Sequence, residues 1–117
     1  MICIEAVVRP ERISSVTAAL EEVGVPGFYY YNVTGQGRQR GVEVFVGRAG
    51  QTATRAAMQK TCIRTVVTDG MKDQVIDAII GASKSPGEGE IGDGKIFVTA
   101  MIDLARVRTN ERGESAL

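Results

Sequence analysis

The chain has 117 residues, of which 44% are hydrophobic and 24% are charged, and this length and composition are typical of one compact domain over residues 1–117. Its 14 lysines and arginines balance 14 aspartates and glutamates, so it lacks the bulk positive charge that recruits nucleic acid or anionic membranes. Without histidine, neither a Ser–His nor a Cys–His nucleophile pair is available, and a zinc site would need two cysteines plus carboxylates.

The N-terminal segment, residues 1–12, contains a short apolar run that is broken by Glu5 and Arg9. We therefore expect neither a signal peptide nor a membrane span. The expected location of the protein is the cytoplasm.

Two segments, beginning at Cys3 and Cys62, share one pattern in constant register. Each starts Cys-Ile, continues through a charged residue to Val-Val, passes a short turn and enters a helical pattern. Pro10 suits the first turn of one helix, and Asp69 is a plausible cap for the other. Apolar residues then recur at helical spacing and predict one buried stripe on each helix: Val16, Leu20 and Val23 in the first, Val75, Ile79 and Ala82 in the second.

A strand candidate follows each helix, at residues 28–33 and 95–102. The order is therefore β-α-β twice, which predicts an α+β, ferredoxin-like fold with two helices on one face of an antiparallel sheet. In that fold the first and third strands are antiparallel neighbours, so Cys3 and Cys62 lie toward opposite ends of the pair. Because a disulfide requires Cα atoms within ~7 Å, we predict two free, buried thiols.

The first strand places alternate residues on the face that the helices leave uncovered, and Val7, Cys62 and Val66 are expected there. A partly apolar face that its own chain does not cover suggests self-association. A solvated mixed face would show the same pattern.

Residues 35–41, GQGRQRG, form a cationic, amide-rich segment after a strand. The glycine spacing misses the dinucleotide-binding fingerprint, and no helical pattern follows. Such a loop can bind a polyanion, with Arg38 as a forked donor and Gln39 as a ligand for a metal or carboxylate, or it can be a solvated glycine-arginine loop. Residues 42–58 make a long insertion of the functional or mobile kind, with Lys60 at its root.

Residues 87–98, GEGEIGDGKIFV, alternate glycine with acidic residues before Lys95 and an apolar strand. Glycine lets backbone N–H groups cradle a phosphate, and Lys95 adds a positive charge beside them. The spelling follows the first part of a Walker loop, but Ile96 replaces the Ser or Thr that binds magnesium, and a strand follows instead of a helix. This excludes a P-loop NTPase and leaves an anion-binding loop or an ordinary glycine-rich hairpin turn.

Four segments together resemble the PII nitrogen-regulatory signalling proteins over nearly the whole chain. They are AVVRPER (6–12), VTGQGRQRG (33–41), IGDGKIFV (91–98) and ARVRTNERGESAL (105–117). The resemblance implies a ferredoxin-like homotrimer with three nucleotide sites in the clefts between subunits. It also implies a long T-loop, here about residues 37–57, that docks on target proteins.

Carried over to this chain, the resemblance assigns the phosphates of ATP or ADP to three separate segments. Gly35, Gly37, Arg38 and Gln39 would form the base of the T-loop; Gly92, Asp93, Gly94 and Lys95 would form the B-loop; and Arg106 and Arg108 would reach in from the neighbouring subunit. Gln39 would also bind Mg²⁺ and, together with Lys60, the effector 2-oxoglutarate. Arg48 would enter the target, either an ammonium channel or a nitrogen-metabolism enzyme such as nitrogenase.

The chain departs from the usual family pattern at several positions. Tyr29 stands where the adenine-contacting residue is usually threonine, and Arg64 stands where a glutamate that orders the arginine pair is common. Residues 42–58 contain no tyrosine, so uridylylation at the usual site cannot occur. The segment before the B-loop, residues 83–90, is longer than is common.

The expected function is that of a non-enzymatic sensor, in which ATP and ADP compete and effector binding repositions the T-loop. No general base is evident, because Asp93 is the only acidic residue inside the core loop motif. Two alternatives remain: a PII-like paralogue that binds another small effector, and a nucleotide-hydrolysing enzyme.

Overall fold

The computed structural model describes residues 1–37, 43–45, 52–54 and 58–117. The predicted T-loop residues Arg38, Gln39 and Arg48 lie outside the described residues. Of residues 43–45 and 52–54, only the backbone is described.

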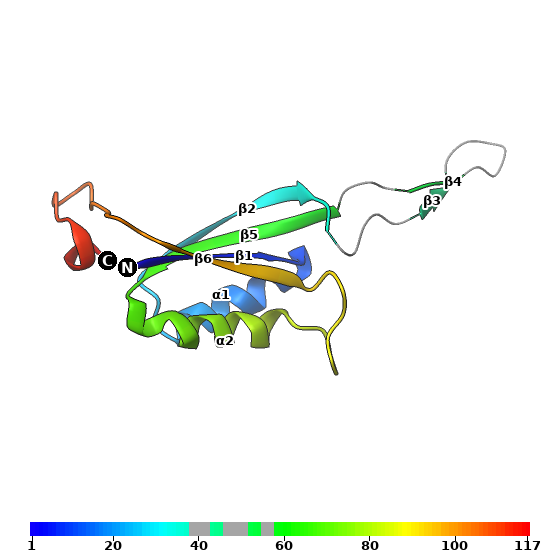
Figure 1. Ribbon diagram of the computed structural model, residues 1–117, viewed down its shortest axis with the longest axis horizontal. Coiled ribbons are helices and arrows are strands. Elements are labelled where there is room, and N and C mark those ends of the chain that lie inside the picture. The colour runs from blue at the N-terminus through cyan, green and yellow to red at the C-terminus, as the bar shows by residue number, and fades with distance from the viewer. Residues whose placement is uncertain (38–42, 46–51, 55–57) are drawn as a thin grey trace.

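The four-stranded antiparallel sheet has the strand order β2-β5-β1-β6. Its elements follow the chain as β1 (Ile2–Val8), α1 (Ile13–Glu22), β2 (Phe28–Gly35), β5 (Met58–Val67), α2 (Lys72–Ser83) and β6 (Gly94–Ala100). Both helices lie on one face of this sheet (Figure 1). Two short strands, β3 (Glu43–Phe45) and β4 (Thr52–Thr54), pair separately inside the T-loop region. The predicted ferredoxin-like α+β fold is confirmed.

The core forms where the apolar stripes of the two helices meet alternate residues of the sheet. Every member is no more than 1% exposed: Ile4, Ala6, Val8, Ile63 and Val67 from the sheet, with Val16, Leu20, Val75 and Ile79 from the helices. Full burial of one such aliphatic side chain contributes about 1.5–3 kcal/mol. This core fixes β1 and β5 at the centre of the sheet, and therefore fixes the loops at both of its ends.

The prediction for the start of the first helix is confirmed, and the prediction for the start of the second is wrong. Pro10 begins a short 3-10 turn, Pro10–Arg12, that leads into α1, as expected. The expectation that Asp69 caps the second helix is wrong, because α2 follows a 3-10 turn, Asp69–Met71, whose N-cap is Thr68 with no side-chain cap. Asp69 is the first residue of that turn. Its carboxylate forms an ion pair with the Met1 amino group at 3.1 Å.

The two cysteines are free and buried, as predicted. The register of β1 against β5 places Cys3 opposite Val66 and Cys62 opposite Val7, so the thiols lie toward opposite ends of the pair. Burial raises the pKa of the Cys62 thiol, which keeps it protonated and unreactive.

The helix-free face of the sheet is partly apolar and is not covered by the described part of the chain. Tyr29 and Tyr31 of β2 pair with Arg64 and Cys62, so their side chains share this face, and their rings stack with centroids 6.4 Å apart. Phe97 of β6 lies in the same row, and all three aromatic side chains are exposed. No helix among the described residues is both long and apolar enough to cross a membrane.

Candidate functional site

The B-loop, residues 92–95, lies at the end of the sheet from which the T-loop departs (Figure 1). The segment 84–91 connects α2 to the B-loop. Gly94 and Lys95, the last two residues of the loop, begin β6 and lie opposite Val8 and Val7 of β1. Gly94 has a φ of 132°, and a Cβ at this position would overlap the carbonyl oxygen of Val7. Only glycine therefore lets β6 approach β1 at this point.

Asp93 is the centre of a hydrogen-bond network inside the B-loop. Its Oδ1 accepts from the Ser85 hydroxyl at 2.5 Å and from Arg9 Nε at 3.2 Å. Its Oδ2 accepts from the backbone N–H groups of Ser85 and Glu90, both at 2.9 Å. The hydrogen bond from the Ser85 hydroxyl, followed by those from the Glu90 and Ser85 N–H groups, holds the pKa of Asp93 far below its usual range. The carboxylate therefore stays ionised and shapes the loop from within.

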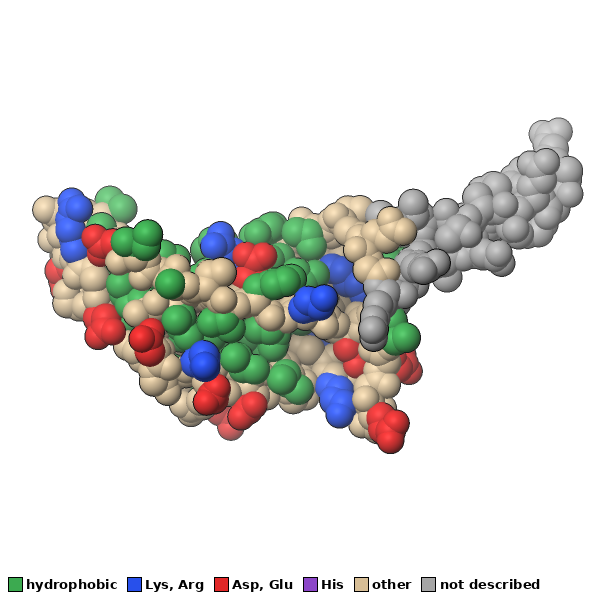
Figure 2. All heavy atoms as spheres, in the orientation of Figure 1, with side chains coloured by type: hydrophobic (Ala, Val, Ile, Leu, Met, Phe, Trp, Pro, Cys, Tyr) green, Lys and Arg blue, Asp and Glu red, His purple; other side chains and the backbone are tan. Residues whose placement is uncertain are grey.

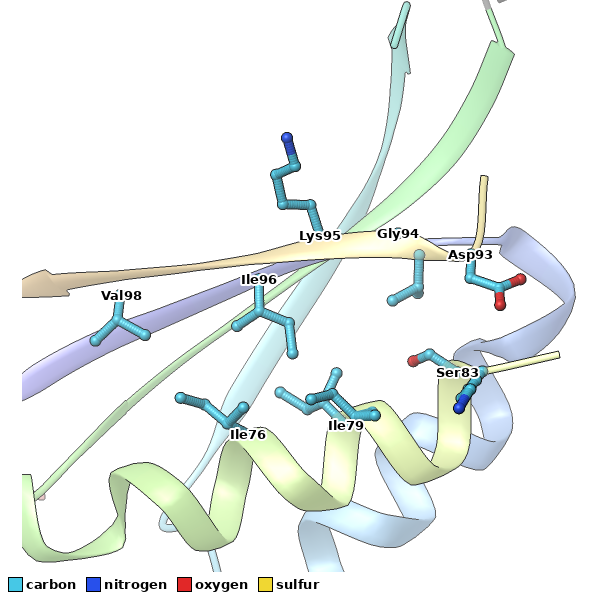
Figure 3. A pocket seen from close by; sticks show the side chains of 11 residues that line it. Ile76, Ile79, Ser83, Asp93, Gly94, Lys95, Ile96 and Val98 are labelled. Carbon is cyan, nitrogen blue, oxygen red and sulfur yellow. The ribbon is translucent and has the colours of Figure 1, made fainter. Parts of the chain in front are cut away.

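Two further cations reach the same end of the sheet. Lys60 Nζ donates to the carbonyl oxygen of Gly92 at 2.7 Å, and burial, with a smaller contribution from nearby Arg9, lowers the pKa of Lys60. Lys95 lies opposite Val7 on β1 and points to the side of β6 away from α2 (Figure 3). With Arg9, this end presents three cations beside a glycine-rich backbone, which is an arrangement that suits a polyanion.

Tyr29, Arg64 and Arg106 line a separate cavity of about 400 Å³, toward the other end of the sheet. The Arg64 guanidinium lies 5.9 Å from the centroid of the Tyr29 ring, and its Nη2 donates to Cys3 Sγ at 3.4 Å. Its Nε lies 3.1 Å from Oε2 of Glu5 without the alignment of a hydrogen bond. The two residues that depart from the family pattern are therefore in contact with each other.

Arg106 is held by the C-terminal part of its own chain. Its Nη2 donates to the carbonyl oxygens of Ala116 and Leu117 at 3.2 and 2.9 Å, and its Nη1 lies 3.5 Å from Oε1 of Glu111. Arg108 is exposed in the turn that follows Arg106. The arginine pair is thus presented near the chain termini, at the far end of the sheet from the B-loop (Figure 1).

The predicted nucleotide-site residues therefore fall into two groups in one chain. Gly35 ends β2 opposite Met58, two residues before Lys60, and Gly37 follows two residues later, whereas Arg106 follows the opposite end of β6. The ladder from Val8–Gly94 to Ile2–Ala100 separates the two ends by roughly 20 Å at about 3.4 Å per residue. The two groups therefore lie at opposite ends of the sheet within one chain.

An apolar groove of about 410 Å³ also runs between α2 and β6. Ile76 and Ile79 of α2 face Ile96 and Val98 of β6 across it (Figure 3). Hydrophobic side chains gather along this edge on the molecular surface (Figure 2). Because β6 is an edge strand, the groove continues the uncovered apolar surface of the chain.

Sequence reasoning missed the residues that support the site. Arg9 was treated as part of a motif and as a break in an apolar run, yet its side chain contacts the B-loop. Ser85 belongs to the lengthened segment before the B-loop, yet its hydroxyl and N–H both bind Asp93. One sequence feature could have indicated the role of Arg9. Pro10 marks the end of the first strand, so the residue before it, Arg9, is a cation at the end of β1.

Fold and site together define a class of protein: a ferredoxin-like α+β chain with a glycine-rich, cation-lined loop at one end of its sheet. The family model described as "Nitrogen regulatory protein P-II" matches residues 1–111. The chain belongs to the PII family of nitrogen-regulatory signalling proteins, and the resemblance stated from its motifs is confirmed.

Similar proteins span bacteria, archaea and plants. The nitrogen regulatory protein P-II of Microchaete diplosiphon is 37% identical over 97% of both chains. The nitrogen regulatory protein P-II 2 of Methanothermobacter thermautotrophicus is 39% identical over 97% of this chain and 95% of its own. The crystal structure of Arabidopsis thaliana PII bound to citrate superposes with a TM-score of 0.77 at 35% identity, over 99% of this chain and 91% of that one.

Proposed function

We propose that this PII protein is a nucleotide sensor that works as a homotrimer, with ATP or ADP bound in the clefts between subunits. The observation that carries the proposal is the division of the phosphate-binding groups between the two ends of the sheet. A head-to-tail ring would bring Lys95 of one copy to Arg106 and Arg108 of the next, and three such contacts close. The exposed aromatic side chains of the helix-free face and the groove beside β6 offer apolar surface for that association.

The oligomeric state and the ligand can be tested together. Light scattering at micromolar protein concentration should give three times the mass of one chain, and calorimetry should give one ATP or ADP per chain. A monomer, or a trimer that gives no heat with either nucleotide, would contradict this proposal.

We propose that Mg²⁺ enters with ATP and is held by Gln39, so that 2-oxoglutarate can chelate the same metal. Lys60 would bind the far carboxylate of the keto acid. The hydrogen bond from Lys60 to the carbonyl oxygen of Gly92 supports its place at this site, because it holds the ammonium group beside the B-loop.

The effector can be tested by titrating 2-oxoglutarate into protein saturated with Mg-ATP, and then into Lys60→Ala. Binding should require both metal and ATP, and the variant should lose keto-acid binding while it retains most of its ATP affinity. Unchanged keto-acid affinity in Lys60→Ala would remove Lys60 from the effector site.

A regulatory role without catalysis fits the chemistry of the B-loop. Asp93 is the acidic residue within the B-loop, and four hydrogen bonds already engage its carboxylate. It is therefore a poor general base. The T-loop, with Arg48, would instead dock on an ammonium transporter or a nitrogen-metabolism enzyme. Sustained release of phosphate from ATP by the purified protein would favour the enzymatic alternative.

The contact between Tyr29 and Arg64 favours a second candidate, a PII paralogue with a different small effector. Both side chains line the cavity beside Arg106, where an arginine adds donors and positive charge in place of the usual acid. Calorimetry with ATP, ADP and 2-oxoglutarate separates the candidates, because a paralogue of this kind would bind a nucleotide without responding to the keto acid.

A further inference from the structure

The B-loop is held by a side chain that directly follows β1 and that the nucleotide-site assignment does not include. The Arg9 side chain is 18% exposed. Its Nε donates to Asp93 Oδ1 and its Nη2 donates to the carbonyl oxygen of Ile91, both at 3.2 Å. A third contact places its Nη2 3.8 Å from Oε2 of Glu90. One guanidinium thus reaches both residues that flank Gly92.

These contacts fix the direction of a backbone donor. A peptide group is planar, with its C=O and N–H on opposite sides. Because Arg9 holds the Ile91 carbonyl, the Gly92 N–H is turned away from Arg9. Lys60 holds the next carbonyl, that of Gly92, and the Asp93 N–H on the opposite side donates to Glu90 at 3.1 Å. Gly92, with a φ of 101°, would be free to rotate without these anchors.

We infer that Arg9 is a positioning residue for nucleotide binding: it holds the B-loop in its phosphate-binding shape through Asp93 and the Ile91 carbonyl, without contacting the ligand. This inference rests on the proposed nucleotide site. Its physical basis is preorganisation, because a loop that is already ordered loses less conformational entropy when it binds. Both contacts use the planar fork of the guanidinium, which a lysine does not reproduce.

The test compares Arg9→Gln, Arg9→Lys and Ser85→Ala with the wild-type chain, using ATP and AMP as probes. We expect Arg9→Gln to weaken ATP binding roughly tenfold or more and to leave AMP binding nearly unchanged, because the B-loop is assigned to the distal phosphates. Arg9→Lys should lose most of the same affinity, although it keeps the charge. Ser85→Ala should act in the same direction, because it removes a different anchor of Asp93.

Amide hydrogen exchange supplies a readout that does not depend on the ligand. The N–H groups of Ser85, Glu90 and Asp93, which donate within this network, should exchange faster in all three variants. Arg12→Gln is the matched control, because it removes the arginine that ends the short turn, Pro10–Arg12, which Arg9 precedes. It should change neither exchange nor affinity.

The outcomes separate the inference from the proposed function. Wild-type protein that does not bind ATP overturns the proposed function and this inference with it. Wild-type binding together with full ATP affinity in Arg9→Gln overturns the inference alone. Restoration by Arg9→Lys, with normal exchange in the loop, also overturns it and makes Arg9 a direct phosphate ligand. If Arg9→Gln fails to fold, normal ATP affinity and normal exchange in Ser85→Ala overturn the inference.

Discussion

The two ends of the sheet hold their cations in different ways. At the B-loop end, Arg9 and Lys60 bind backbone carbonyls and an ionised carboxylate, so that one side chain just after β1 and one from β5 shape a loop. At the end near the termini, Arg106 is held by carbonyl oxygens of the C-terminal turn and by Glu111. At one end, side chains hold a loop in place. At the other end, the C-terminal turn and Glu111 hold the side chain of Arg106 in place. This difference is the basis of the proposal that one nucleotide site is shared between two subunits.

The largest effect is expected from breaking the B-loop end at Gly94. Gly94→Ala forces a Cβ onto the Val7 carbonyl at a φ of 132°, so β6 must move away from β1. We expect a loss of on the order of 3 kcal/mol or more in the free energy of unfolding, measured by urea denaturation. Gly81→Ala is the control, since open space surrounds Gly81 in α2, and it should stabilise the helix by about 0.5–1 kcal/mol. A stable Gly94→Ala would show that the edge strand tolerates displacement.

The second prediction tests whether the two ends of the sheet form one site across subunits. Lys95→Ala and Arg106→Ala should each weaken ATP binding roughly ten- to a hundredfold, as expected for the loss of a charge-assisted contact of ~1.5–3 kcal/mol. For Lys95→Ala the loss should be greater for ATP than for AMP. Equal losses for both nucleotides would place Lys95 away from the distal phosphates.

Mixed trimers sharpen this test. When the two variant chains are refolded together, a cleft between Lys95 of the Arg106→Ala chain and Arg106 of the Lys95→Ala chain is fully wild type. Calorimetry should then recover a fraction of high-affinity sites that neither variant shows alone. If mixing restores nothing, the two ends do not meet in one cleft.

A smaller effect is expected from acid at the B-loop end. The pKa of Asp93 is depressed in the folded chain relative to about 3.9 for an unfolded aspartate. Its contribution to stability is therefore fully present above pH ~4 and is lost as the pH falls through the folded pKa. The stability difference between wild type and Asp93→Asn should stay constant from pH 7 to about pH 5 and shrink below pH ~4. A difference that grows with acid would contradict the assigned role of the carboxylate.

The smallest effect concerns the centre of the sheet, between the two ends. Cys62 is 1% exposed, and burial raises its pKa. We expect neither Cys62 nor Cys3 to react with a thiol reagent at pH 8 within the time in which both react after denaturation. Rapid labelling of one cysteine in the folded protein would show that the centre of the sheet opens.

The fold could be predicted because its signals are local and occur twice. The helical stripes at Val16 and Leu20, and at Val75 and Ile79, indicated both helices, and the two Cys-Ile strands indicated the antiparallel pair. The B-loop glycines and Lys95 were identified from the motif IGDGKIFV at residues 91–98. The supports of the site could not be predicted, because the contacts of Arg9 with Asp93 and of Lys60 with Gly92 join residues that are distant in sequence. The contact of Arg64 with Tyr29 likewise depends on the register of β2 against β5.

The strand order also has a consequence for how the chain folds. In the first half the chain contributes β1 and β2, and in the second half β5 and β6, yet every ladder of the four-stranded sheet joins strands from different halves: β1 with β5, β1 with β6, and β2 with β5. Neither β-α-β repeat has a strand ladder of its own within this sheet. A separated half would leave its strands unpaired, so we expect the two repeats to depend on each other for folding. Folding then depends on contacts between residues that are distant along the chain, and such contacts slow the folding of small domains. A cut between the repeats should therefore be far more damaging than the duplicated sequence suggests.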